Sequence, residues 1–358
     1  MSRRADIIVI GAGIAGASIA AELAGAASVI ILEAEERPGY HSTGRSAAFW
    51  SESYGGPLIR PLTTASGPFL SEQGLLSPRG AIHLADAAGK DSLRRLADEF
   101  PDLLEPLDRG RLEAAIPGLR PGWDQGLAEP SCADINVAGL HDFCLAKARR
   151  GGAELVTDMR VAAIERTGGR WRIGSFEADV LVNAAGAWAD QVAVMAGERP
   201  IGIAPYRRTI AQIRVDPPAP PDLPLVVDAS AHFYFKPEAG GRLWLSPHDE
   251  TPCGPCDCAA EEIDVAVAID RLGQVVDWRV ERVEHKWAGL RSFAPDRLPV
   301  YGFGARGNGF FWCAGQGGFG IQTAPAGARL AASLLLGAAP DGIAAGLDPA
   351  PYLAERFG

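Results

Sequence analysis

The sequence contains no apolar run long enough to cross a bilayer, for which a helix needs about 20 consecutive apolar residues. It also lacks a basic surplus, since 34 Lys and Arg stand against 44 Asp and Glu, for a net charge of −10. This balance argues against non-specific binding to nucleic acid or to an anionic membrane. Neither an internal repeat nor a low-complexity segment is present. These absences favour a globular protein of about two domains.

An export signal is also missing from the start of the chain. Arg3 and Arg4 are followed by Asp6, and the next apolar residues run directly into a glycine-rich turn. This arrangement predicts a first β-strand rather than a cleavable leader. The chain has six cysteines, and at 358 residues it is long enough to bury a large core without disulfides. We therefore expect a reduced, cytoplasmic protein.

The cysteines do not complete a metal-binding pattern. Cys253, Cys256 and Cys258 form one cluster near His248 and could ligate zinc, but no second cysteine pair accompanies them. We expect no metal site, and we expect Cys313 to pack in the core.

The strongest positive signal lies within residues 6–33. Residues 7–10 are short, apolar and β-branched, which predicts a buried parallel strand. Gly11, Gly13 and Gly16 follow as G-x-G-x-x-G and lead into helix-forming residues at 17–23. In such a unit the first glycine allows a tight turn, the second lets a pyrophosphate approach the backbone, and the third allows close helix–strand packing. The free amides at the helix start favour the phosphate charge.

A second strand at residues 29–32 ends at Glu33, where a carboxylate can accept hydrogen bonds from a ribose. Strand, glycine triplet, helix, second strand and acid together predict dinucleotide binding. The alternative is a glycine-rich packing turn. Residues 37–48, RPGYHSTGRSAA, are predicted to form a loop whose amides and hydroxyls suit a phosphate or a ring edge, unless it is only a flexible surface loop.

The rest of the chain mixes helical and strand-like patterns. Helices are expected at 91–99, 136–150, 187–196, 261–276 and 323–336, with a pattern at 57–74 broken by Pro61 and Pro68. Strands are expected at 80–85, 153–157, 160–166, 171–173, 179–186, 209–215, 232–236 and 242–246, and a loop at 114–129. From residue 201 to about 283, strands alternate with proline-rich segments, which indicates a sheet-forming insertion.

Six sequence blocks together resemble the D-amino-acid oxidase superfamily of FAD enzymes, which also holds glycine and sarcosine oxidases. The blocks are GAGIAGASIA, GYHSTGRSAA, LVNAAGAWAD, FYFKPEAG, HKWAGLRSF and GFFWCAGQGGFGIQT. They span nearly the whole chain, and the nearest likeness is to the bacterial D-arginine dehydrogenase type. The resemblance implies an α/β fold: a Rossmann-like FAD-binding domain of residues 1–50, 137–200 and 285–358, and an inserted mixed or antiparallel-sheet substrate domain of residues 51–136 and 201–284.

The resemblance also implies which residues hold FAD. It implies dissociable FAD, because no cysteine just after Arg291 is available for a covalent flavin link. The implied cofactor residues are Gly11, Gly13, Ile14, Ala15, Gly16, Glu33, Ala34, His41, Ser42, Thr43, Gly44, Arg45, Ser46, Ala47, Ala48, Val161, Ala185, Gly186, Trp188, Gly289, Arg291, Gly315, Gly317, Gly318, Phe319, Gly320, Ile321 and Gln322. The last block is expected to aim a helix start at the pyrimidine end of the flavin, where its dipole stabilises negative charge.

For the substrate, the resemblance points to a carboxylate clamp. Arg291, just after a predicted strand, presents a fork that pairs with a carboxylate, unless it forms a surface or interdomain salt bridge. Arg208 is favoured as a second anchor over Arg207, because neighbours on a strand point to opposite faces. Tyr234 is expected to add a hydroxyl, while Phe233 and Phe235 pack on the other side. Tyr54 is expected over the entrance, and Gly289 and Gly318 to offer carbonyls to the amine.

Three positions depart from the D-arginine pattern. A glutamate that receives the cationic tail is matched here by Ala81, a loop histidine by Phe49 and a second loop acid by Ala231. A buried guanidinium without a carboxylate is costly, so an apolar or small side chain is expected to be preferred over D-arginine.

The predicted reaction is oxidative deamination of a D-amino acid by an FAD-dependent dehydrogenase or oxidase. Hydride passes from Cα to flavin N5, and water converts the imino acid to a 2-oxo acid and ammonia. No histidine stands out as a base. The electron acceptor is left open among a quinone, an electron-transfer protein and O₂. Two alternatives remain: oxidation of a secondary amine (sarcosine or glycine type) or a 2-hydroxy acid, and a non-catalytic flavin subunit of a complex.

Overall fold

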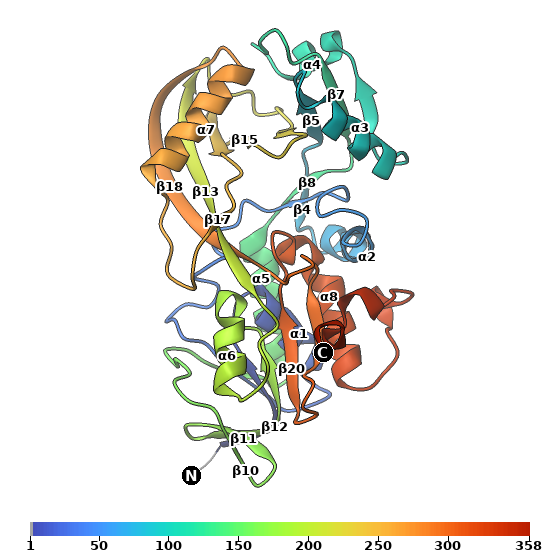
Figure 1. Ribbon diagram of the computed structural model, residues 1–358, viewed down its shortest axis with the longest axis vertical. Helices are drawn as coiled ribbons and strands as arrows, with labels where there is room; N and C mark the ends of the chain where they lie inside the picture. The colour runs from blue at the N-terminus through green and yellow to red at the C-terminus, as the bar shows by residue number, and fades with distance from the viewer. Residues whose placement is uncertain (1–2) are drawn as a thin grey trace.

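The computed structural model describes residues 3–358 and contains three sheets (Figure 1). The first sheet has eight strands in the order β10-β11-β12-β1-β2-β9, with β20 joined to β12 and β19 to β20. Its parallel strands are β1 (Arg3–Ile10), β2 (Val29–Leu32), β9 (Glu154–Val156), β12 (Phe176–Asn183) and β20 (Phe310–Ala314). Antiparallel strands β10 (Glu165–Thr167), β11 (Arg170–Ile173) and β19 (Val300–Phe303) complete it.

The alternation of apolar residues in β1 fixes the two faces of this sheet. Ile7 and Val9 pack in one core cluster with helices α1 (Ile14–Leu23), α5 (Val137–Arg150) and α8 (Gly320–Leu335). Ile8 and Ile10 pack in another, together with α6 (Ala189–Met195). Since successive strand residues face opposite sides, this apolar run is buried on both.

The second sheet has nine strands and mixed topology. Its order is β17-β13-β16-β15-β14-β5-β7-β6, with β18 beside β13; β14 and β5 pair in parallel and the other pairs are antiparallel. The strands are β5 (Ala81–Ala85), β6 (Glu105–Leu107), β7 (Gln125–Glu129), β13 (Ala204–Asp216), β14 (Leu225–Asp228), β15 (Tyr234–Glu238), β16 (Arg242–Ser246), β17 (Thr251–Pro252) and β18 (Arg279–Phe293). The long β13–β18 pair runs from this sheet toward the first sheet (Figure 1).

Shorter elements surround the second sheet. Helix α7 (Glu262–Val275) packs on the core that contains Phe233 and Phe235, as expected for those two residues. Helices α3 (Lys90–Glu99) and α4 (Arg109–Ala115) lie near β5 and β7. A third sheet joins β3 (Phe49–Trp50), β8 (Ala133–Ile135) and β4 (Leu76–Pro78), and α2 (Arg60–Glu72) packs against α8. Short 3-10 turns lie at Gly186–Trp188, Gly342–Ala344, Ala350–Tyr352 and Ala354–Phe357.

Three local predictions were wrong. The pattern at 57–74 forms one helix, α2, because Pro61 lies in its first turn, where no N–H is needed, and packing against α8 outweighs the bond lost at Pro68. The predicted loop at 114–129 ends in strand β7, which pairs with both β5 and β6. The predicted strand at 160–166 is irregular up to β10, and its start lies beside Glu33, whose carbonyl accepts from the Met159 amide at 2.8 Å.

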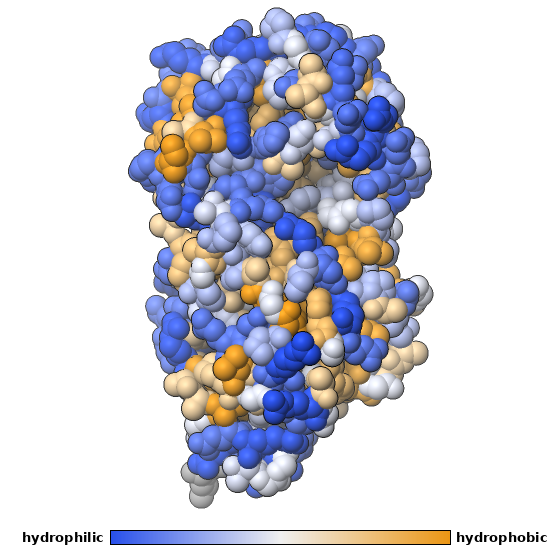
Figure 2. All heavy atoms as spheres, in the orientation of Figure 1, coloured by the Kyte–Doolittle hydropathy of each residue, from blue (hydrophilic) through white to orange (hydrophobic). Residues whose placement is uncertain are grey.

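The surface in view is mainly polar, and its apolar side chains occur in separate groups (Figure 2). Within residues 3–358, no helix has the length and apolar character that a membrane crossing requires.

Candidate active site

The larger of two adjoining cavities has a volume of about 550 Å³ and lies against the ends of β1 and β2 and the start of α1. Residues from five of the six sequence blocks line it, the exception being FYFKPEAG. Those expected to hold the cofactor and present in its wall are Gly11, Gly13, Ile14, Ala15, Glu33, Ala34, His41, Ser42, Thr43, Ser46, Val161, Ala185, Gly186, Trp188, Arg291, Gly317, Gly318, Gly320 and Ile321. The fold thus brings together segments that are far apart in the sequence.

The glycine turn at this cavity admits no side chains. Gly11 has φ +98°, and a Cβ on Gly16 would lie 1.9 Å from the Gly11 carbonyl oxygen. At the start of α1, the Ile14 amide donates to Thr43 Oγ1 at 2.9 Å, which ties the loop at 41–48 to the turn. A bare backbone at a helix start, next to a long cavity, fits the pyrophosphate of FAD.

Glu33 lies at the end of β2, as expected, and its carboxylate is mostly engaged within the turn. Its Oε2 accepts from the Ala12 amide at 2.6 Å and its Oε1 from the Glu35 amide at 3.0 Å. A carboxylate has about four acceptor positions, so capacity for a ribose hydroxyl remains. The ribose contact of Glu33 stays a prediction.

Several expected cofactor residues lie outside this cavity. Ala47, Ala48 and Gln322 line the smaller cavity instead, while Gly16, Gly44, Arg45, Gly289, Gly315 and Phe319 line neither. Arg45 turns away, where its guanidinium donates to the Cys258 carbonyl at 2.9 Å and pairs with Asp257. Gln322 is 2% exposed. Its side-chain oxygen accepts from the Ser51 amide, and its side-chain nitrogen donates to the Tyr54 carbonyl and the Thr63 hydroxyl. For these residues the cofactor contact remains a prediction.

The smaller cavity, of about 200 Å³, adjoins the larger one, because Ser46, Arg291, Gly318 and Ile321 line both. Tyr54, Arg208 and Tyr234 also line it, so five of the six residues expected at the substrate lie together. The sixth, Gly289, is adjacent, since a Cβ built on it would lie 3.9 Å from an Arg291 guanidinium nitrogen.

Arg291 lies within β18 rather than just after a strand, and its guanidinium stands where the two cavities meet. Within residues 3–358, its side chain forms neither an ion pair nor a hydrogen bond to protein. Burial lowers the pKa of Arg291, and the positive charge of Arg208 lowers it further, whereas Tyr234 and Tyr54 act in the other direction. A desolvated cation beside a second cation is a strong site for an anion.

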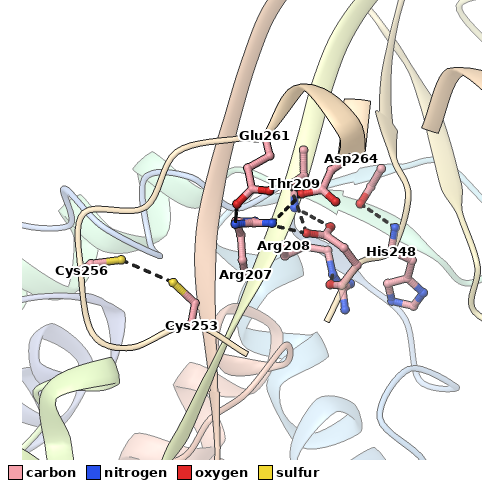
Figure 3. Close-up of polar contacts among 10 residues, drawn as sticks. Arg207, Arg208, Thr209, His248, Cys253, Cys256, Glu261 and Asp264 are labelled. Atoms are coloured by element: carbon pink, nitrogen blue, oxygen red, sulfur yellow. Dashed lines mark hydrogen bonds and ion pairs between the residues drawn. The ribbon is translucent and has the colours of Figure 1, made fainter. Parts of the chain in front are cut away.

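Arg208 and Arg207 have different surroundings (Figure 3). Arg208, whose side chain is 2% exposed, lines the smaller cavity and donates to the Asp249 carbonyl at 2.8 Å and to Glu250 at 3.2 Å. Arg207 pairs instead with Glu261, and with Asp264 at 2.8 Å. The alternation along β13 therefore leaves only Arg208 at the cavity.

His248 also lines this cavity, although no histidine stood out as a base in the sequence. It has φ +54°, and its ring centroid lies 5.7 Å from that of Tyr234. Burial first, and then the charge of Arg208, lower the pKa of His248 to about 3, so its imidazole is neutral at ordinary pH. No motif marks His248 in the sequence, because a loop between β16 and β17 brings it to the site.

The three departures from the D-arginine pattern occur together. Phe49, Ala81 and Ala231 all line the smaller cavity. Sequence reasoning also missed Ser51, Ser53 and His83 in the same wall, with Glu129 behind them. Short polar residues scattered over two segments give no sequence signal.

The cysteine cluster lines neither cavity, and Cys253 and Cys258 pack against Ala187 and Leu290, which line the larger one. All six cysteines are free, and the Cys253 and Cys256 sulfurs are 3.5 Å apart (Figure 3). In the described part of the chain, no three His, Cys, Asp or Glu side chains form a group suited to a metal ion.

Known proteins resemble this chain in sequence and in fold. The family model "FAD dependent oxidoreductase" (DAO) matches residues 6–334. Glycine oxidase of Pseudomonas aeruginosa is 26% identical over 375 residues, covering 98% of each chain. The crystal structure of glycine oxidase from Geobacillus kaustophilus has a TM-score of 0.85 at 24% identity, covering 98% of each chain. L-alpha-glycerophosphate oxidase from Mycoplasma pneumoniae, solved with FAD bound, has a TM-score of 0.84 at 15% identity, covering 93% of this chain and 95% of that one.

The match of the family model to most of the chain agrees with the parallel sheet, the glycine turn and the long cavity. The chain belongs to the DAO family of FAD-dependent oxidoreductases.

Proposed function

We propose that this protein catalyses the FAD-dependent oxidative deamination of a D-amino acid, giving the 2-oxo acid and ammonia, and prefers an apolar or small side chain over D-arginine. The proposal assigns FAD to the larger cavity and the amino acid to the smaller one. It also assigns residues 1–50, 137–200 and 285–358 to the FAD-binding domain, and residues 51–136 and 201–284 to the substrate domain.

The observation that carries the proposal is the unpaired guanidinium of Arg291 at the junction of the two cavities. A carboxylate bound there neutralises Arg291 and relieves its repulsion with Arg208. Bidentate pairing then fixes the orientation of the acid as well as its position. The hydroxyl of Tyr234, in the same wall, is available as a further donor to this carboxylate.

FAD, when bound, supplies the acceptor for the hydride that leaves Cα. The protein residues orient the substrate so that Cα faces the larger cavity. Tyr54 lies over the junction, since a Cβ on Gly318 would be only 2.4 Å from its hydroxyl oxygen. Its ring packs against Phe319 and Phe49, which helps to exclude water from the site.

A second candidate is oxidation of glycine or of a secondary amine. The 26% identity to a glycine oxidase over 98% of the chain favours it, and so does the small volume of the substrate cavity. The carboxylate clamp serves either substrate, whereas a non-catalytic role leaves Arg291 unexplained. The electron acceptor is not identified by any of these features.

The test is anaerobic mixing of the FAD-loaded protein with separate substrates, followed by the flavin absorbance. D- and L-amino acids, glycine, sarcosine and 2-hydroxy acids are each supplied in excess. Bleaching by small D-amino acids, with D-arginine slower, supports the proposal. Bleaching only by glycine or sarcosine supports the second candidate, and bleaching by L-amino acids alone refutes both. A second run in air separates oxidase from dehydrogenase activity.

A further inference from the structure

One wall of the smaller cavity is polar and has a carboxylate behind it. Ser51, Ser53 and His83 line the cavity, and Glu129, the last residue of β7, is fully buried next to them. Glu129 Oε2 accepts from Ser51 Oγ at 2.9 Å and from Ser53 Oγ at 2.6 Å, with His83 Nε2 at 3.1 Å. Its Oε1 accepts from the Glu52 amide at 2.8 Å. The carboxylate is therefore saturated by the wall itself.

The position of Glu129 relates directly to Ala81. The two residues are direct partners across the antiparallel β5–β7 pair. Because opposed residues of a sheet share a face, the carboxylate belongs to the same side as the bare methyl group of Ala81. The wall thus has a negative charge one strand away from Ala81, and the hydroxyls of Ser51 and Ser53 cover it.

The hydrogen bonds fix what this wall presents to a ligand. Ser51 and Ser53 both donate to Glu129, and Ser53 Oγ also lies 3.3 Å from Ser51 Oγ and 3.3 Å from His83 Nε2. Each hydroxyl oxygen has two lone pairs, so acceptor capacity remains for another group. Burial acts to raise the pKa of Glu129, but hydrogen bonds from His83 and the two serines outweigh it, and the pKa stays below its usual value. The wall is consequently a set of acceptors with a fixed negative charge behind them.

The remaining lining limits the size and number of polar groups. Phe49, Leu96, Leu225 and Val227 are apolar, and the whole cavity measures about 200 Å³. Asp228 also lines it, but its Oδ2 is already engaged by the His232 amide and by His232 Nδ1, each at 3.0 Å. A short side chain with one hydrogen-bond donor satisfies the polar wall and fills the apolar remainder. A second carboxylate would face the charge of Glu129, and a guanidinium would find that carboxylate already covered.

We propose that the wall of Ser51, Ser53 and His83, backed by Glu129, selects amino acids whose short side chain carries an uncharged donor, a hydroxyl or a carboxamide, over isosteric apolar or acidic side chains. This inference rests on the proposed function, because it concerns the side chain of the same substrate. The class is a small D-amino acid such as D-threonine or D-asparagine.

Isosteric pairs provide the experiment, with the holoenzyme mixed anaerobically and flavin bleaching followed at several substrate concentrations. D-threonine is compared with D-valine, and D-asparagine with D-aspartate. We compare the rate constant of flavin bleaching divided by the substrate Kd. One added hydrogen bond is expected to make this ratio about fivefold higher for D-threonine than for D-valine. Removal of like-charge repulsion predicts a preference of about tenfold or more for D-asparagine.

Two variants link these ratios to the wall. Ser53→Ala removes one acceptor and is expected to bring the threonine-to-valine ratio toward one, while Ser71→Ala, an exposed serine on α2, leaves it unchanged. Glu129→Gln is expected to reduce the asparagine-to-aspartate ratio. If Glu129→Gln does not fold, the Ser53→Ala comparison still decides the question.

The two failures are distinguishable. If D-valine and D-aspartate bleach the flavin as well as their polar partners do, this inference is overturned and the proposed function stands. If none of the four D-amino acids bleaches the flavin, while glycine or sarcosine does, the proposed function fails and this inference fails with it.

Discussion

Arg207 and Arg208 are consecutive residues of β13, yet only the Arg208 guanidinium reaches the smaller cavity, while Arg207 pairs with Glu261 and Asp264 near the start of α7 (Figure 3). The alternation of side chains along a strand separates their roles. One arginine lines the cavity to which we assign the substrate, and the other joins α7 to the sheet.

This separation predicts that the same substitution affects substrate affinity at one arginine and folding stability at the other. Arg208→Lys is expected to raise the substrate Kd by about tenfold or more, because a lysine cannot replace a guanidinium fork beside Arg291. Arg207→Lys is expected to leave that Kd nearly unchanged and to lower the free energy of unfolding by about 1 kcal/mol, since its partner Asp264 is partly buried whereas Glu261 is exposed. Kd comes from anaerobic flavin bleaching and stability from urea unfolding. Equal Kd values for the two variants would contradict the assignment.

The glycine turn predicts a steric effect at Gly16. In Gly16→Ala the new methyl meets the Gly11 carbonyl oxygen at 1.9 Å, so the strand–helix turn has to open. We expect a loss of about 3 kcal/mol or more in the free energy of unfolding and little FAD binding. Gly273→Ala is the matched control, because its methyl on α7 meets no atom within 4 Å and alanine favours helix. A stable, FAD-binding Gly16→Ala protein would refute the close packing of this turn.

The contacts of Arg45 are expected to hold the loop at 41–48 in place. Its guanidinium donates to the carbonyls of Cys258 and Ala288 and pairs with Asp257. In Arg45→Ala these contacts vanish, and we expect the FAD Kd to rise by about tenfold, since neighbouring Ser42, Thr43 and Ser46 line the larger cavity, to which we assign FAD. Arg111→Ala, an exposed arginine at α4, is the control. Titration of the FAD-free protein with FAD, followed by fluorescence, provides both values; an unchanged Kd in Arg45→Ala would mean that the loop is held without it.

The parallel sheet and the glycine turn were predictable because local rules determine them. Residues 29–32 form β2 as expected, and Asn136 caps α5 where the helix pattern began, with its side chain accepting from the Gly139 amide. In these segments, periodicity, caps and turn residues all favour the same structure. Pro68 shows the limit of that reasoning, because tertiary packing keeps it inside α2.

The substrate cavity was predictable only in part. Arg291 and Tyr234 lie in two of the six sequence blocks, Arg208 lies on a strand whose alternation favoured it over Arg207, and the structure brings the three together. Glu129 could not be identified in the same way. Its role depends on its pairing with Ala81 and on the segment at residues 51–53, which lies 76–78 residues earlier in the sequence and covers its carboxylate. The local sequence does not determine which distant strands pair. The burial of an acid at the end of a short strand therefore cannot be predicted from the residues around it.

His248 predicts how stability changes with pH. The native pKa of about 3 lies below the value of roughly 6.5 for an unfolded chain, so acid protonates His248 in the unfolded state first. The unfolded state therefore binds more protons between these values, and stability falls as pH falls through that window.

His248→Asn removes this loss, and asparagine tolerates the φ of +54°. We expect urea unfolding between about pH 7 and pH 4 to show a shallower decline for His248→Asn than for the wild type, by up to about 1.4 kcal/mol per pH unit. His285→Asn, at an exposed position, is the control and should follow the wild type. Identical declines in all three proteins would show that His248 takes up its proton in the native state as readily as in the unfolded one.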